Sequence, residues 1–261
     1  MKPEYKNWIP KGMIWSAVGV TAALLLLLLV FGLTGLVSGT LKTALCIIFL
    51  AGTLIGVVVS VWMLLMYRAF SYDGKRQMSR QIIEGIAERV ELPDGGRCLD
   101  VGCGSGALAI ACAKRNPSAS LIGIDRWGQE YASFNKPLCE RNAEAEGVAN
   151  VSFRRGDATK LDFADETFDA VVSNFVYHNI PGDRQKYLLE TLRVLKKGGV
   201  FALHDVFSKF KSGDMQAFVR KLKDMGYESV GLIDTADGTF MTKREAGWMG
   251  LTGSALLIGR K

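Results

Sequence analysis

Residues 98–106, with the sequence CLDVGCGSG, constrain the fold of this chain more than any other segment. An apolar run ends there in a turn with glycine at every second position, and residues 107–114 after it are predicted to form a helix. Because glycine has no Cβ, a ligand can approach the backbone of such a turn closely, and the start of the helix offers unpaired N–H groups. The segment therefore predicts a strand–turn–helix unit of an α/β fold that binds a nucleotide-like ligand.

Two classes of cofactor use such a turn. Read from Gly102, the residues fit the dinucleotide pattern G-x-G-x-x-G/A, with Ala107 in the last place. Read as D-x-G-x-G-x-G from Asp100, they resemble motif I of the class I S-adenosylmethionine (SAM) dependent methyltransferases. This second interpretation also accounts for Asp100 and Gly106, which the first leaves unexplained. The resemblance implies that Gly102, Gly104 and Gly106 approach the cofactor and that Asp100 helps to hold its amino-acid end.

The next segments resemble the same family in the same order. An apolar run ends at Asp125, 19 residues after Gly106, close to the roughly 20 expected of an acid that binds ribose hydroxyls. NAD enzymes carry the same acid, so Asp125 does not separate the two classes. The resemblance implies that Trp127 packs on the adenine, and that Asp157, followed by Ala158, accepts from the adenine amine. The alternative for Asp157 is an Asx turn after a glycine.

Two later segments complete the resemblance, which covers residues 97–261. Residues 168–174 resemble motif IV, the strand beside the transferred methyl group, and Asn174 at its end is expected at the cofactor. Residues 194–200 resemble the turn into the fifth strand. Short β runs that alternate with helical segments predict a parallel sheet whose ligands bind at the carboxyl ends of the strands. The family's fold is a seven-stranded, mostly parallel, doubly wound Rossmann-like sheet.

The chain has only two histidines, and both follow predicted strands at the ligand-binding edge. His178 comes shortly after residues 168–174, and His204 stands beside Asp205 at the end of the next strand. Methyl transfer from a sulfonium needs alignment and exclusion of water, and a neutral acceptor such as a phenol also needs a base. His178, His204 and Asp205 are therefore the candidate catalytic residues. The alternative for each is a structural role at the rim of the site.

Two long uncharged stretches precede this region. Residues 13–41 and 43–67 contain no charged side chain, and only Lys42 separates them. About 20 apolar residues suffice for a helix to cross a bilayer, so we expect a hairpin of two transmembrane helices at about 13–37 and 43–67. The first stretch is too long for the apolar part of a signal peptide, and a second follows at once.

The two stretches divide the chain into three expected regions and suggest on which side of the membrane its ends lie. We expect a membrane anchor at 1–70, a linker with an amphipathic helix at 71–96, and a SAM-dependent methyltransferase domain at 97–261. Bases flank the outer ends of both stretches, so both termini and the catalytic domain are expected in the cytoplasm. These bases are Lys2, Lys6, Lys11, Arg68, Lys75, Arg76 and Arg80.

Charge and cysteine content limit the partners. The net charge of +6 does not indicate nucleic-acid binding. The basic residues near the apolar stretches are better explained by attraction to anionic lipid headgroups. The five cysteines show neither a CxxC pair nor a metal-ligand spacing, so no metal site is expected. The oligomeric state stays open.

The sequence thus predicts a membrane-anchored methyltransferase that moves the methyl group of SAM to a small lipophilic acceptor. A quinone or isoprenoid phenol, a lipid amine and a hydrophobic thiol all fit, and the acceptor atom stays open. In a plainer version the hairpin only localises the enzyme. Two alternatives from other classes are a non-catalytic SAM-binding membrane sensor and an NAD(P)-dependent oxidoreductase.

Overall fold

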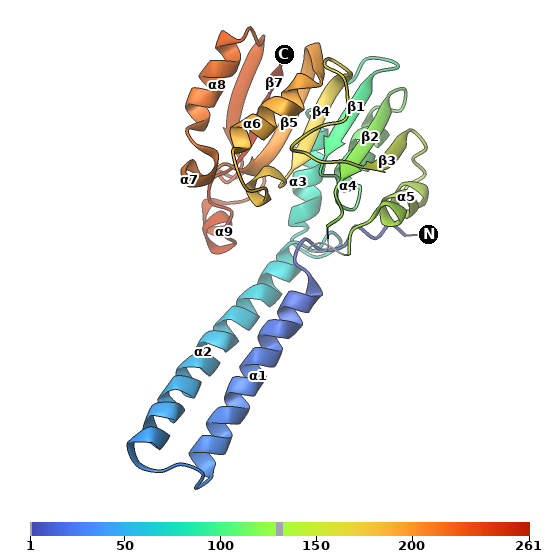
Figure 1. Cartoon of the computed structure of the whole chain (residues 1–261). Helices are drawn as coiled ribbons and strands as arrows, with labels where there is room; N and C mark the ends of the chain where they lie inside the picture. The colour runs from blue at the N-terminus through green and yellow to red at the C-terminus, as the bar shows by residue number, and fades with distance from the viewer. Residues whose placement is uncertain (1, 129–132) are drawn as a thin grey trace. The chain divides into compact units, whose positions relative to one another are not determined.

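The structure, a computed structural model, describes residues 2–128 and 133–261. The chain forms two compact units and passes between them twice (Figure 1). Residues 7–79 form the hairpin unit. The residues up to Lys6, together with Arg80–Lys261, form what we call the sheet unit. The expected anchor at 1–70 therefore differs from the structure at its start, because residues 2–6 belong to the sheet unit.

The hairpin unit contains helices α1 (Lys11–Leu33) and α2 (Gly39–Ala69), which pack against each other. The Thr21 hydroxyl lies 3.4 Å from that of Ser60, and the rings of Phe31 and Phe49 stack 5.6 Å apart. By length and composition, both helices are long and apolar enough to cross a membrane.

The bounds of both helices differ from the expected ones. Helix α1 ends at Leu33 because Thr34 has an extended backbone, with φ −100° and ψ 165°. Helix α2 starts at Gly39, so Lys42 lies within its first turn and not in the loop. The Lys42 ammonium donates to the Thr34 carbonyl oxygen at 3.2 Å, which occupies one carbonyl that the end of α1 leaves free.

The sheet unit confirms the predicted fold: seven strands in the order β3-β2-β1-β4-β5-β7-β6, with only β7 antiparallel to its neighbours. The strands are β1 (Arg97–Val101), β2 (Ser120–Asp125), β3 (Val151–Arg155), β4 (Phe168–Asn174), β5 (Leu195–Val206), β6 (Ser229–Asp234) and β7 (Ser254–Arg260). The helices are α3 (Met78–Ala87), α4 (Ala107–Arg115), α5 (Lys136–Ala145), α6 (Arg184–Arg193), α7 (Lys209–Ser212), α8 (Met215–Asp224) and α9 (Lys243–Trp248), with a 3-10 turn η2 (Tyr177–Asn179).

Helices cover both faces of the sheet (Figure 1). Alternate residues of a strand point to opposite faces, and Asp100 of β1 bonds α4, so α4 lies on the face opposite to Leu99 and Val101. Helices α6 and α8 pack on the Leu99 face. The buried cluster there contains Leu99, Val101, Phe201 and Leu203 from the strands, Leu188 and Leu192 from α6, and Phe218 and Leu222 from α8.

Helix α3 confirms the predicted amphipathic helix before the sheet. The apolar side chains of its expected buried face, including one that comes three residues after the end of α3, are at most 3% exposed. They are Ile82, Ile83, Ile86 and Val90.

The strand order reverses between β1 and β4, which lie side by side although β2 and β3 come between them in the chain. In open parallel sheets, ligands bind outside the carboxyl ends of the strands at such a switch point. The turn after Val101 starts there, and Asn174 ends the neighbouring strand at the same edge. The fold therefore brings the sequence-predicted site residues to one edge of the sheet.

Candidate functional site

The glycine turn lies between β1 and α4, and backbone bonds hold its first half. The N–H groups of Gly102 and Cys103 both donate to the Ile124 carbonyl oxygen, at 2.8 and 2.9 Å. Gly102, Gly104 and Gly106 all have positive φ, so each occupies backbone space that L-residues rarely adopt.

The three glycines differ in what a Cβ would meet. At Gly102 it would clash with Val176, and at Gly106 it would lie 2.9 Å from the ring of Phe153, so both glycines allow close internal packing. At Gly104 its nearest neighbours are atoms of the Phe134 ring, 3.8 Å or more away. Gly104 is therefore the glycine that leaves room for a ligand.

Asp100 lies beneath this turn and is 2% exposed. Its Oδ2 accepts from the Ala109 N–H at 3.0 Å, but its buried Oδ1 has no hydrogen-bond partner among the described residues. Burial raises the pKa of this carboxyl to about 8. Without a ligand the carboxyl is therefore mostly protonated at neutral pH, and a ligand that brings a donor or a positive charge to Oδ1 would stabilise its ionised form.

Asp125 and Trp127 close the turn from the β2 side. Asp125 Oδ2 accepts from the Gly104 N–H at 2.9 Å, and Oδ1 accepts from the Trp127 N–H at 2.6 Å. The Trp127 indole N–H donates to the Gly104 carbonyl oxygen at 3.0 Å. Both predicted residues thus meet at Gly104, the glycine of this turn that has free space beside it among the described residues.

Asp157 forms the Asx turn that was its alternative interpretation. Its Oδ1 accepts from the N–H and the hydroxyl of Thr159, at 2.8 and 2.7 Å, and these bonds lower its pKa. The Gly156 N–H donates to the Asp125 carbonyl oxygen at 3.0 Å, which keeps this loop beside Asp125. Ala158 is half-buried and packs against the core. Asp157 is exposed, and because these bonds use only Oδ1, its Oδ2 can still accept a hydrogen bond from a ligand.

His178 and Asp205 form a dyad at the carboxyl ends of β4 and β5. The distance from His178 Nδ1 to Asp205 Oδ1 is 2.6 Å, and the carboxylate is 1% exposed, while the histidine side chain is 25% exposed. Asp205 Oδ2 also accepts from the backbone N–H of Tyr177 at 2.6 Å. When Nδ1 donates to the carboxylate, the lone pair stands on Nε2, so the imidazole can take a proton there.

His204 differs from the expectation of a residue at the rim, because it is 0% exposed. Its Nδ1 lies 2.7 Å from Asn174 Oδ1, and its Nε2 lies 2.9 Å from the Thr235 hydroxyl and 3.0 Å from that of Ser254. Burial lowers the pKa of His204 to about 3, so the ring is neutral and donates to Asn174 from Nδ1. This geometry makes His204 a positioning residue for Asn174 and not a base.

Sequence reasoning missed the residues that support the site from a distance. Thr235 and Ser254 fix the tautomer of His204, and the Cys139 thiol donates to the Gly104 carbonyl oxygen at 3.2 Å. None of them stands in a motif; Thr235 and Ser254 meet His204 through the order of the strands, and Cys139 meets Gly104 through the packing of α5 on the turn.

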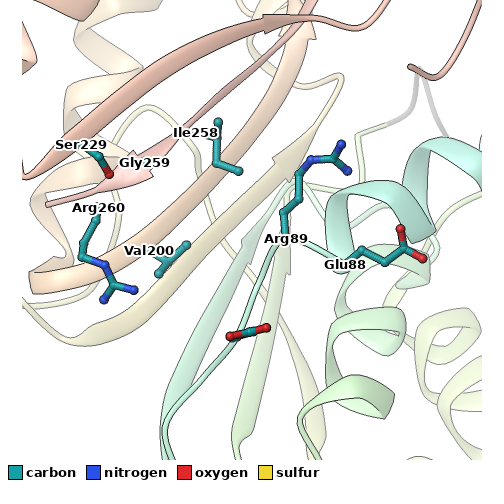
Figure 2. A pocket seen from close by; sticks show the side chains of 8 residues that line it. Glu88, Arg89, Val200, Ser229, Ile258, Gly259 and Arg260 are labelled. Carbon is teal, nitrogen blue, oxygen red and sulfur yellow. The ribbon is translucent and has the colours of Figure 1, made fainter. Parts of the chain in front are cut away.

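A shallow polar pocket of about 290 Å³ lies at the other end of the strands (Figure 2). Val200 pairs there with Arg260, the last residue of β7, and Ser229 starts β6, whereas Asp205 pairs with Ala255 at the opposite end of β7. We assign the site to the glycine turn, because that is where the motif residues converge. The pocket is lined by Glu88, Arg89, Glu91, Val200, Ser229, Ile258, Gly259 and Arg260.

Comparison with known proteins adds family information. A family model described as "Methyltransferase domain" matches residues 99–203. The chain is 39% identical over 127 residues to an arsenite methyltransferase of Aquipseudomonas alcaligenes, covering 47% of this chain and 36% of that protein. It is 34% identical over 118 residues to a demethylmenaquinone methyltransferase of Geobacillus kaustophilus, covering 45% and 48%. The chain thus spans half or less of the length of these two relatives.

Among solved structures, the cyclase SpnF shares the fold, with a TM-score of 0.53 at 22% identity over 73% of this chain and 85% of that one. At this identity the similarity concerns the fold alone. Because that protein is named as a cyclase, the fold by itself does not identify the reaction. The reaction therefore has to be argued from the site.

Proposed function

The chain belongs to the class I SAM-dependent methyltransferases, with SAM as its cofactor, and from this premise we propose that it is a membrane-anchored enzyme that methylates a small lipophilic acceptor. SAM supplies a methyl group on a sulfonium, which is already an activated leaving group. The chain's own residues must hold the cofactor, align the acceptor, exclude water and, for a neutral acceptor, take a proton.

The observation that carries the cofactor assignment is the open face of Gly104 with Asp125 beside it. We infer that Asp125 accepts from ribose hydroxyls and that Trp127 and Asp157 contact the adenine. Gly102, Gly104, Gly106 and Asn174 would line the cofactor, and the unpartnered Oδ1 of Asp100 fits a group that carries a positive charge. The same turn with Asp125 would suit NAD(P), but that assignment leaves Asp100 without a role.

Asp125 and Asp157 should differ in how much they contribute to SAM binding. Asp125→Ala removes a charged acceptor for two hydroxyls and should cost on the order of 1.5–3 kcal/mol of binding free energy. Asp157→Ala should cost less, since one amine contact is lost and water can partly replace it. Calorimetric titration of each variant with SAM measures both effects.

Asp237→Ala is the matched control, because Asp237 forms the same Asx turn with Thr239, accepting from its hydroxyl at 2.8 Å. Its affinity for SAM should equal that of the wild type. A larger loss for Asp157→Ala than for Asp125→Ala would reverse our placement of the adenine and ribose ends.

The pKa of about 8 at Asp100 predicts a pH-dependent stability difference. The folded pKa lies above the unfolded value of about 4, so the contribution of Asp100 to stability is present below pH 4 and is lost as pH rises towards 8. Asp100→Asn removes this titration. The Tm of the variant relative to wild type should therefore rise between pH 5 and pH 8, while its affinity for SAM falls.

Thermal melts at the two pH values, with and without SAM, test this prediction. A Tm difference that is the same at pH 5 and pH 8 would contradict a raised pKa at Asp100.

The catalytic step rests on the His178–Asp205 dyad. We infer that His178 Nε2 takes the proton of a neutral acceptor such as a phenol, while Asp205 fixes the tautomer and stabilises the imidazolium that forms. Tyr177 beside it is 1% exposed, bonds the Thr191 hydroxyl at 2.7 Å and has a pKa raised by burial, so it is a poor base.

A lipophilic acceptor follows from the membrane proposal. We infer that α1 and α2 cross a bilayer as a two-pass anchor, with both termini and the sheet unit in the cytoplasm. Phe210 in α7 is 97% exposed between Lys209 and Lys211, a composition that suits a lipid surface with anionic headgroups.

The relatives suggest two kinds of acceptor. One is named for demethylmenaquinone, a quinone-type compound, and another for arsenite. Thiolates are the ligands that soft arsenic prefers, and the cysteines of the sheet unit, Cys98, Cys103, Cys112 and Cys139, are all buried. This burial favours a quinone or related phenol.

One experiment tests the whole function. The protein in membranes would be incubated with methyl-labelled SAM and a lipid extract, and the labelled product identified by mass spectrometry. We expect a labelled lipophilic phenol or quinone derivative. SAM binding without any labelled product would favour the sensor, and binding of a nicotinamide cofactor in place of SAM would favour the oxidoreductase.

The hairpin should matter only for acceptors in a bilayer. Replacing residues 11–69 with a flexible linker, while keeping residues 1–6 and 80–261, should slow methylation of an embedded acceptor much more than that of a water-soluble analogue. The reason is that tethering raises the effective concentration of enzyme and acceptor on one surface. Equal slowing of both reactions would mean that the hairpin shapes the active site, and no slowing would leave localisation as its role.

A further inference from the structure

The first described residues of the chain pack on α5 of the sheet unit, although α5 comes much later in the sequence. The side chain of Asn142 is 1% exposed and pairs with the backbone of Glu4 through two bonds. Its Oδ1 accepts from the Glu4 N–H at 2.7 Å, and its Nδ2 donates to the Glu4 carbonyl oxygen at 3.2 Å. The N-terminal segment, residues 2–6, is therefore held by a buried carboxamide 138 residues away.

The same carboxamide reaches the glycine turn. Asn142 Nδ2 also donates to the Ser105 carbonyl oxygen at 3.0 Å, and Ser105 lies between Gly104 and Gly106. Cys139, three residues earlier on α5, bonds the preceding carbonyl of the turn, that of Gly104. Helix α5 thus holds two consecutive carbonyl groups of the turn.

Holding these carbonyls orients the turn's donors. In a trans peptide the N–H points opposite to the C=O of the same unit. With the Gly104 and Ser105 carbonyls fixed on α5, the N–H groups of Ser105 and Gly106 are fixed as well. The Gly106 N–H also donates to the Cys103 carbonyl oxygen at 2.8 Å, so the donor that depends most on this hold is the Ser105 N–H, whose peptide unit follows a glycine, the residue most free to change conformation.

A second contact ties the N-terminal segment to both helices that flank the turn. The Tyr5 side chain is 6% exposed, and its hydroxyl donates to Glu146 Oε1 at 3.1 Å. Glu146, at the end of α5, also forms an ion pair with Lys114 of α4, at 2.7 Å. The segment therefore covers the seam between α4 and α5.

We propose that residues 2–6 are a structural part of the cofactor site, and that Asn142 is the positioning residue that couples them to the glycine turn. This inference rests on the proposed use of that turn for SAM. It has a topological consequence: the hairpin unit, whose first helix α1 starts five residues after Lys6, is joined at both ends to elements of the sheet unit. A truncation that removes the whole N-terminus with the hairpin thus removes part of the cofactor site.

The test uses the full chain in detergent or nanodiscs, with SAM affinity measured by calorimetry and kcat measured at saturating SAM. Asn142→Ala should raise the Kd for SAM by about 5- to 15-fold, the value expected for one buried hydrogen-bond link, with kcat changed by less than about twofold. Deleting residues 2–6 should raise Kd to a similar extent. Combining both changes should add little, because both break the same link.

Asn150→Ala is the matched control. Asn150 Nδ2 also donates to buried carbonyl oxygens, those of Ala113, Asn116 and Ala119, but at the far end of α4 and not at the turn. This variant should lower Tm and leave the Kd for SAM unchanged. Asn142→Asp, which keeps the acceptor for the Glu4 N–H but loses both donors, serves if Asn142→Ala does not fold.

Hydrogen exchange gives a readout that does not depend on SAM. Backbone amides of residues 103–107 should exchange faster in Asn142→Ala and in the deletion variant, but not in Asn150→Ala. Unchanged Kd and exchange in both variants, or an equal rise of Kd in Asn150→Ala, would overturn the inference. A wild-type protein that binds no SAM would overturn the proposed function and this inference with it.

Discussion

Gly104→Val should abolish measurable SAM binding while the sheet unit stays folded. Gly104 has φ +55°, and a Cβ there meets only the Phe134 ring, at 3.8 Å or more, so a branched side chain can be accommodated by the protein but not beside a ligand. We expect Kd to rise on the order of 100-fold or more, which corresponds to about 2.7 kcal/mol of binding free energy. Calorimetry with SAM and a thermal melt of the same sample measure affinity and folding together.

Gly147→Val separates the steric effect from backbone strain. Gly147 has φ +68°, and a Cβ there has no neighbour within 4 Å among the described residues, so a valine meets a similar conformational penalty. The control should lose a comparable amount of stability and keep its affinity for SAM. Wild-type affinity in a folded Gly104→Val protein would remove the cofactor from this turn.

The sequence predicted the strand ends of the site well, because their signals are short-range. Asp100, Asp125 and Asn174 each stand at the end of an apolar run, and a parallel sheet brings such ends to one edge. Because strands and helices alternate along the chain, these strands run parallel, and a residue that ends a strand therefore lies at the carboxyl edge of the sheet. The strand pattern alone therefore predicts a cofactor site at this edge of the sheet.

What the sequence missed depends on contacts between distant segments. His204 looked like a rim residue because its strand position is correct. However, Thr235, just after β6, and Ser254, at the start of β7, are 31 and 50 residues away and enclose it. Asn142 carries no motif, and its partner Glu4 lies before the first apolar stretch. Burial of a polar side chain is set by the elements that pack over it, and local patterns do not record those elements.

The two histidines show how the surroundings divide roles between similar residues. Both stand near a carboxylate at the same sheet edge, yet His204 is enclosed and neutral while His178 keeps a quarter of its side chain exposed. A base must reach its substrate and also change its charge, so only the partly exposed ring meets both conditions. The enclosed ring serves instead to hold the Asn174 carboxamide in one orientation.

His178→Gln should therefore lower kcat for a phenol-type acceptor by about 10²- to 10⁴-fold, the usual contribution of a general base, with the Kd for SAM unchanged. Asp205→Asn should lower kcat as well, since an amide can support the wrong tautomer of His178. Quenched time-course assays with labelled SAM at saturating acceptor measure kcat, and calorimetry measures the Kd for SAM.

His204→Gln is the contrasting variant. It removes a buried ring that bonds three side chains, so its main effect should be a lower Tm, with a loss of kcat far smaller than that of His178→Gln. An acceptor that is already a thiolate or a neutral amine needs no proton removed before attack, so His178→Gln should slow its methylation only slightly. Comparing a phenol, an amine and a thiol with the same variant thus tests the base and identifies the acceptor class. If His178→Gln retains wild-type kcat with all three acceptors, the dyad has no part in proton transfer.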